Sequence, residues 1–149
     1  MEPKNKKIKL NKGSYLLLIE IKKPMQTKIG DLGLINFDKG YYIYVGSAMN
    51  NLKKRVERHL NSSSLGREKD RKHWHIDYLL SSSEAEISDI YYKEFEEKEE
   101  CSVAEKVKRE SFHEVKGFGS SDCKCESHLF KVSGANLKEL IKGFIKMKL

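Results

Sequence analysis

The sequence predicts an α+β fold in which a small mixed β-sheet is flanked by helices. Apolar runs rich in strand-forming residues cover positions 14–21, 41–45, 87–95 and 129–132. Amphipathic helical patterns lie between and after these runs, and no internal repeat interrupts their order. This succession of strands and helices is typical of an α+β domain.

The chain has the size of one domain. Its 149 residues can enclose a substantial core but are too few for two ordinary domains. Residues 1–12 contain five lysines, one proline and almost no apolar pattern, which is typical of a flexible basic tail. We therefore predict a tail over residues 1–12 and a single domain over residues 13–149.

The first two core strands are expected at residues 14–21 and 41–45. The first run, SYLLLIEI, is short and almost wholly apolar, which suits a central strand that is buried on both faces. Between the two strands, Pro24 and several glycines predict a loop that contains one extra strand near residues 32–37. Gly46 follows the second run and is expected to close that strand.

A helix is predicted directly after the second strand. Asn50 or Asn51 can cap it. Three apolar residues at spacings of four mark its buried stripe: Leu52, Val56 and Leu60. Arg55 and His59 each lie three positions after a member of the stripe. We expect these two side chains to lie next to each other on one edge of the stripe and to face a cleft.

The middle of the chain continues the alternation of elements. The segment HWHIDYLL at residues 73–80 is too short to be assigned, although its apolar residues must be buried. A strand is predicted at residues 87–95 and a helix at residues 98–110. Glu100 begins the helix face that also carries Val103, Ala104 and Val107, so we expect its carboxylate to point inward.

The last elements are a short strand and a closing helix. The strand is expected at residues 129–132. Asn136 and Glu139 resemble a capping pair for the helix. Its apolar positions are Leu137, Leu140, Ile141, Phe144 and Ile145.

Composition limits the class of protein. Apolar residues make up 38% of the chain and charged residues 34%, and no apolar run approaches the length of a membrane span. The basic start MEPKNKKIKL lacks the pattern of a secretory leader, which favours a cytoplasmic location. The net charge of +7 and a pI near 9.2 favour a polyanionic partner, with nucleic acid first. A lysine-rich surface that serves only solubility or ion pairing is the alternative.

Several motifs of this chain resemble one nuclease superfamily. Gly13-Ser14-Tyr15 on the first strand, Tyr44-Val45-Gly46 on the second and Arg55-x-x-x-His59 on the helix resemble the GIY-YIG nucleases, and Glu100 fits the same pattern. The phrases YVGSA, RHL, HWHIDYLL, Glu100-Cys101 and GFGSSDCKCESHLF resemble a branch of small archaeal and bacterial proteins described as endonuclease-like. The resemblance runs from about residue 13 to residue 132. Ser14 stands where isoleucine is usual, and the interval between the two tyrosines is long.

The resemblance implies a metal-dependent DNA endonuclease with a role in DNA repair or genome maintenance. Its active site would lie on the sheet face and would use one divalent metal ion, Mg²⁺ or Mn²⁺. Carried over to this chain, the catalytic positions are Tyr15, Tyr44, Arg55, His59 and Glu100.

These residue types suit phosphodiester hydrolysis. Arg55 can donate two hydrogen bonds to the scissile phosphate, and Glu100 can hold the metal ion while phosphate and water complete the shell. The attacking water must also lose a proton. Tyr15 or Tyr44 is the first candidate for this base, although a tyrosine with an ordinary pKa of about 10 would need a nearby cation. His59, with an ordinary pKa of roughly 6.5, is the second candidate.

Each of these residues also has an ordinary interpretation. Strand tyrosines often bury their rings, and a polar pair on a helix edge often extends past the core into solvent. A glutamate in the first turn of a helix commonly interacts with the helix dipole. The joint order of two strand tyrosines, an Arg-His pair and one inward glutamate favours catalysis.

Basic residues around this site predict a track for the phosphate backbone of DNA. Those in and after the first helix are Lys53, Lys54, Arg58, Arg67, Lys69, Arg71 and Lys72. Ordinary solvated surface is the alternative. His73 is a further candidate for this track, whereas His75 is expected to be a structural hydrogen-bonding residue.

The three cysteines offer a second metal hypothesis. Cys123-x-Cys125-x-x-His128, with Cys101 as a fourth ligand, could bind zinc, but the C-x-C spacing is tighter than usual. Small buried thiols and a tight turn before the last strand are the favoured interpretation. Two functions besides the endonuclease thus stay open: a non-catalytic nucleic-acid-binding module and a zinc-stabilised interaction module.

Overall fold

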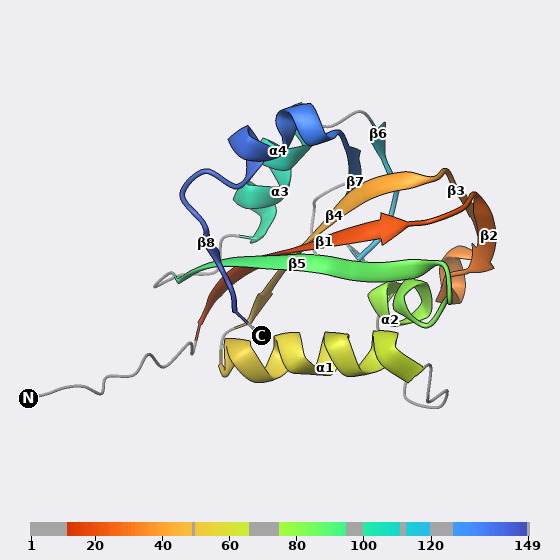
Figure 1. The fold of residues 1–149 in the computed structure, drawn as a ribbon, viewed down its shortest axis with the longest axis horizontal. Coiled ribbons are helices and arrows are strands. Elements are labelled where there is room, and N and C mark those ends of the chain that lie inside the picture. Colours follow the sequence, from red (N-terminus) through yellow and green to blue (C-terminus); the bar gives the residue numbers. More distant parts are fainter. Residues whose placement is uncertain are drawn as a thin grey trace, which may run out of the picture.

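A computed structural model of the chain describes residues 12–48, 50–65, 75–94, 100–110, 113–119 and 127–148. The fold is α+β, as predicted, with a sheet between two layers of helices (Figure 1). Most of the predicted basic tail, residues 1–11, lies outside the described residues. No helix in the described segments is both long and apolar enough to cross a membrane.

The main sheet has six strands in the order β6-β7-β4-β1-β5-β8. Their bounds are β1 Gly13–Ile21, β4 Gly40–Ala48, β5 Ala85–Glu94, β6 His113–Glu114, β7 Leu129–Val132 and β8 Ile145–Lys146. Every pairing between these described strands is antiparallel, where a mixed sheet was expected. The reason is that β4 and β5 run in the same direction but pair on opposite sides of β1, so they are not neighbours.

A small hairpin stands apart from the main sheet. It consists of β2 (Met25–Lys28) and β3 (Leu34–Phe37), joined through the short 3-10 helix η1 (Gly30–Leu32). The extra strand expected near residues 32–37 is therefore present, but its partner is β2.

The central position predicted for the first strand is confirmed. β1 pairs with β4 on one side and β5 on the other, and nearly all of its residues are buried. Successive side chains alternate between the faces of a strand. Tyr15 and Leu17 thus belong to one hydrophobic cluster, and Leu16 and Leu18 belong to the other.

Gly46 does not close β4, because the strand continues to Ala48. Gly46 lies opposite Tyr15 in the ladder between β4 and β1. A Cβ atom at Gly46 would collide with the Tyr15 ring, at its hydroxyl-bearing end. The glycine therefore provides the space in which that aromatic ring lies over the strand.

Four helices cover the two faces of the sheet (Figure 1). They are α1 Leu52–Leu65, α2 His75–Leu80, α3 Glu100–Glu110 and α4 Gly134–Leu140. Apolar residues of α1 and α2 pack with Tyr15, whereas those of α3 and α4 pack with Leu16 on the opposite face. The segment HWHIDYLL, unassigned from sequence, is helical from His75 onward.

The cap of α1 agrees with the sequence, but the cap of α4 does not. Asn51 has a positive φ of 47° and its Oδ1 accepts the backbone N–H of Lys54 at 3.1 Å. In α4 the cap is Ser133, whose Oγ accepts the N–H of Asn136, so the predicted cap at Asn136 was wrong. An extended Ser133 places Asn136 already inside the first turn.

The closing helix is also shorter than expected. α4 ends at Leu140, and Ile145 belongs to β8 instead. Gly143 adopts a positive φ of 87°, a conformation that suits glycine and interrupts a helix. The chain can then turn back, so that Ile145 pairs with Tyr92 of β5.

Candidate active site

Tyr15 of β1 and His59 of α1 form a buried pair between the sheet and the helix. The hydroxyl of Tyr15 lies 2.8 Å from Nε2 of His59, and the two rings are tilted at a centroid distance of 5.5 Å. Tyr15 is 2% exposed and His59 is 0% exposed. The structure thus joins two of the predicted catalytic residues, which are 44 positions apart in the sequence.

The expectation that His59 faces a cleft was wrong. His59 follows Leu52 by seven positions and Val56 by three, so it lies on the buried stripe of α1 and not on the edge of that stripe. The space over Gly46 lets the Tyr15 ring reach it, and the resulting hydrogen bond makes burial of the imidazole tolerable. The spacing of seven positions from Leu52 and three from Val56 was the signal in the sequence.

Burial keeps His59 neutral. It lowers the pKa of the imidazole from 6.5 to about 3, because the charged form would lose its hydration. The carboxylate of Asp77 opposes this shift, while Arg58 and Arg55 add to it. At neutral pH the side chain is therefore an uncharged hydrogen-bonding partner of Tyr15.

Tyr44 completes an aromatic cluster with this pair. Its ring meets the edge of the His59 ring at a centroid distance of 6.2 Å and that of Phe118 at 6.1 Å. Tyr44 is 8% exposed, more than either member of the buried pair. The two strand tyrosines therefore flank one imidazole on the same face of the sheet.

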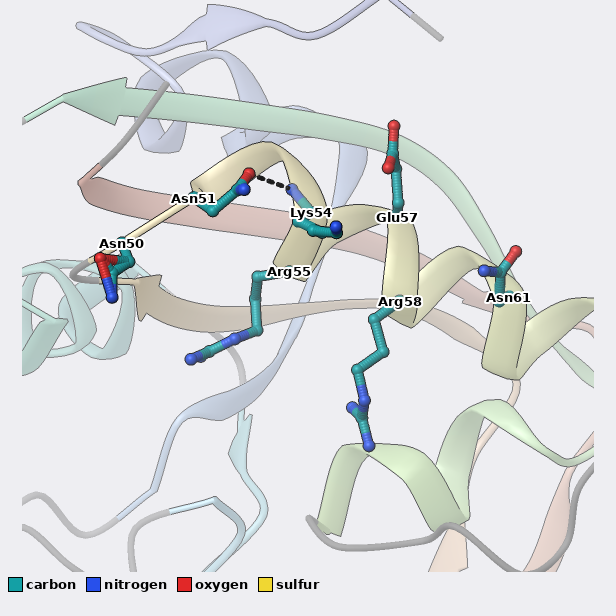
Figure 2. Close-up of a pocket in the computed structure, with 7 residues that line it drawn as sticks. All are labelled: Asn50, Asn51, Lys54, Arg55, Glu57, Arg58 and Asn61. Carbon is teal, nitrogen blue, oxygen red and sulfur yellow. Dashed lines mark hydrogen bonds between the residues drawn. The ribbon is translucent and has the colours of Figure 1, made fainter. Parts of the chain in front are cut away.

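Arg55 lies at the surface beside this cluster. Its Nη1 donates to the backbone carbonyl of Ser47 at 3.0 Å, which ties the start of α1 to the end of β4. Figure 2 shows Arg55 and Arg58 extending from the same side of α1, whereas Glu57 extends from the opposite side. Arg55 is partly exposed and lines an open hollow along the helix.

A shallow hollow of about 520 Å³ follows this surface of α1. It is lined by Asn50, Asn51, Lys54, Arg55, Glu57, Arg58 and Asn61. Three of these side chains are cationic and one is anionic. The hollow is therefore suited to an anionic ligand, and its asparagines add neutral donors and acceptors.

Arg58 has a structural partner in addition to its place in the hollow. Its two terminal nitrogens contact the two carboxylate oxygens of Asp77, each at 3.2 Å. Asp77 is 2% exposed, so this fork of hydrogen bonds stabilises a buried charge and links α1 to α2. Asp77 was not among the residues predicted for the site. A lone carboxylate within the apolar segment HIDYLL was the available signal.

Glu100 begins a helix on the other side of the sheet. The inward residues of α3 belong to the hydrophobic cluster opposite to that of Tyr15, Tyr44 and His59. The side chains of Glu100 and Cys101 lie outside the described part of the structure. Among the described residues, no three acidic, histidine or cysteine side chains are grouped as a metal site.

The remaining predicted residues fall into three groups: exposed, buried, and outside the described residues. Lys53 and Lys54 are exposed on α1, as a phosphate track requires. His128 is buried, and its backbone joins Phe118 and Val45 through hydrogen bonds of 2.8 and 2.9 Å. Outside the described residues lie Arg67, Lys69, Arg71, Lys72, His73, Cys123 and Cys125.

His75 is a structural hydrogen-bonding residue, as predicted. Its Nε2 lies 2.9 Å from Oδ1 of Asp31, and its Nδ1 accepts the backbone N–H of Gly119 at 2.8 Å. The hydrogen bond from the imidazole lowers the pKa of the Asp31 carboxyl. Neither partner could be foreseen, because each lies 44 positions away in the sequence.

These features define a small α+β protein with a buried Tyr-His pair on one sheet face and a cationic hollow on the helix above it. The chain belongs to the family described as domain of unknown function DUF123, whose model matches residues 14–148. Searches of curated proteins and of solved structures gave no match.

Proposed function

We propose that this protein is a metal-dependent DNA endonuclease that acts in the cytoplasm, in DNA repair or genome maintenance. One observation supports this proposal above the others: Tyr15, Tyr44 and His59 gather on one sheet face, and Arg55 projects from the helix that covers them. Four of the five positions implied by the resemblance to GIY-YIG nucleases thus share one region of the molecule.

Arg55 would bind the scissile phosphate. It is partly exposed, and Lys54 and Arg58 lie in the same hollow. A planar guanidinium can donate two parallel hydrogen bonds to phosphate oxygens and offset the charge that develops on them. The net charge of +7 would strengthen the approach of DNA through release of counterions.

Tyr44 is the better placed of the two tyrosines to take a proton from water. Tyr15 and His59 are both more deeply buried than Tyr44. His59 is a weak base because burial holds its pKa near 3. In this proposal the Tyr15–His59 pair orients the Tyr44 ring, and Tyr44 accepts the proton.

A divalent ion, Mg²⁺ or Mn²⁺, would offset charge on the phosphoryl oxygens and favour ionisation of the attacking water. Glu100 is the ligand that the sequence predicts for it. Mg²⁺ often binds proteins through only one or two carboxylates and keeps several waters, so a single glutamate suits such a site. Because α3 packs on the opposite face of the sheet, substitution of Glu100 is the direct test of this ligand.

A non-cleaving nucleic-acid-binding protein is the second candidate. The observation that favours it is the burial of Tyr15 and His59, which keeps these two groups away from a ligand on α1. The cationic hollow would serve DNA binding equally well without catalysis. The two candidates therefore share the binding surface and differ only in whether phosphodiester bonds are cut.

The deciding experiment is a nuclease assay on end-labelled DNA. Single-stranded, duplex, flapped, uracil-containing and abasic substrates are incubated with the native protein and Mg²⁺, Mn²⁺ or a chelator. Glu100→Ala is the test variant, and Glu105→Ala is the matched control because Glu105 is exposed on the same helix. We expect metal-dependent cleavage that Glu100→Ala abolishes and Glu105→Ala retains. Binding without cleavage under every condition would replace the endonuclease with the second candidate.

A further inference from the structure

His75 joins three segments that are distant in sequence. It is the first residue of α2, and its side chain is largely buried, with 11% exposed. Nε2 contacts Asp31 in η1, and Nδ1 contacts the backbone of Gly119 in the turn at residues 116–119. The ring also meets the edge of the Phe118 ring at a centroid distance of 5.6 Å.

The two hydrogen bonds determine where the ring proton lies. The backbone N–H of Gly119 donates to Nδ1, so Nδ1 carries no proton. Nε2 then carries the proton and donates it to the carboxylate of Asp31. The observed geometry therefore requires the neutral imidazole, because a second proton on Nδ1 would point at another N–H group.

The turn that His75 holds forms a wall of the candidate active site. Phe118 is fully buried and packs edge-on against Tyr44. Gly119 has a positive φ of 71°, and a Cβ atom there would lie 3.1 Å from Cε1 of Tyr44. Any release of the turn would thus loosen the packing around the Tyr44 ring.

We propose that His75 is a positioning residue that clamps the turn at residues 116–119 against Tyr44. The clamp uses both ring nitrogens: Nδ1 accepts the Gly119 N–H of the turn, and Nε2 holds the ring on Asp31. The same histidine therefore helps to determine the shape of the candidate site.

Two substitutions separate the two hydrogen bonds of His75. In His75→Asn the side-chain oxygen takes the place of Nδ1 and can still accept the Gly119 N–H. In His75→Gln the amide nitrogen takes the place of Nε2 and keeps only the bond to Asp31. We expect amide exchange at Gly119, followed by NMR at neutral pH, to be at least tenfold faster in His75→Gln than in His75→Asn. Equal exchange rates in the two folded variants would overturn the clamp.

The consequence for catalysis rests on the proposed function, whereas the clamp itself does not. If the protein cleaves DNA, His75→Gln should lower the cleavage rate at saturating DNA, and His75→Asn should largely restore it. Equal cleavage rates in the two variants would show that the hydrogen bond from Gly119 to His75 does not affect the reaction. If the protein does not cleave DNA, the NMR results still decide whether the clamp exists.

Discussion

The two faces of the sheet have cores of different character. The face under α1 and α2 buries Tyr15, Tyr42 and Tyr44 within its cluster, and His59 against Tyr15. On the face under α3 and α4, Tyr91 belongs to the hydrophobic cluster, and the buried Ser14 lies on the same side of β1 as Leu16. Burial of polar groups costs free energy unless they are hydrogen-bonded, so a face that concentrates them is a candidate for function. The face under α3 and α4 is covered chiefly by aliphatic side chains.

The largest effect is expected where the polar face is most crowded. Gly46→Ala places a methyl group in the space of the Tyr15 ring and should lower the free energy of unfolding by about 3 kcal/mol or more. Urea denaturation measures this change. Gly134→Ala is the matched control, because no atom lies within 4 Å of the added Cβ there. A tolerated Gly46→Ala would contradict the observed packing of Tyr15.

The two arginines of α1 should differ in their contribution to stability. Arg58→Ala removes a fork of hydrogen bonds from the buried Asp77 and should cost about 2 kcal/mol of unfolding free energy. Arg55→Ala removes a partly exposed side chain from the same helix and should cost less than about 1 kcal/mol. Thermal or urea unfolding compares the two variants. Equal losses of unfolding free energy would contradict the distinction between Arg58 as a structural residue and Arg55 as a binding residue.

Buried His59, on the face under α1 and α2, predicts that the free energy of unfolding depends on pH. Its pKa falls from 6.5 to about 3 on folding, so between these values the unfolded chain binds a proton that the folded chain does not. The free energy of unfolding should therefore decrease as the pH falls below 6.5, by up to about 1.4 kcal/mol per pH unit. His59→Gln, whose amide can still form a hydrogen bond with Tyr15, should remove this slope. A slope unchanged by the substitution would show that other groups cause it.

The smallest effect expected is on DNA affinity. Arg55→Ala should weaken binding roughly fivefold, which corresponds to about 1 kcal/mol, and should reduce the salt dependence by about one phosphate contact. Lys138→Ala removes the same charge from exposed α4 on the other face and should leave affinity almost unchanged. Fluorescence anisotropy at several salt concentrations measures both. Equal losses would assign DNA binding to net charge instead of to the hollow on α1.

Local pattern was sufficient for most elements of the fold. The apolar run of β1 and the strand at residues 129–132 were predicted correctly, because hydrophobic periodicity depends only on neighbouring residues. The cap of α1 was predicted at Asn50 or Asn51 for the same reason, and it is Asn51. The predicted end of β4 at Gly46 was wrong. A glycine is needed there because the Tyr15 ring of the adjacent strand occupies the space of a side chain, and no pattern of neighbouring residues reveals this.

The candidate site depends more on distant contacts. The sequence predicted that Tyr15, Tyr44 and His59 belong to one site, and the structure brings them together. It did not predict that His59 is buried. The buried carboxylate of Asp77 was missed. The side-chain position of Glu100 lies outside the described residues.

The sequence by itself determined the fold class, the central strand, the start of α1 and the basic charge of this protein. These features follow from side-chain periodicity, capping chemistry and composition, which act over a few residues or sum over the whole chain. Only the tertiary structure decided that His59 is buried against Tyr15, that α3 lies on the opposite face, and that His75 bridges to Asp31 and Gly119. Such contacts join residues 44 positions apart, and their energies depend on burial and geometry that no local pattern specifies.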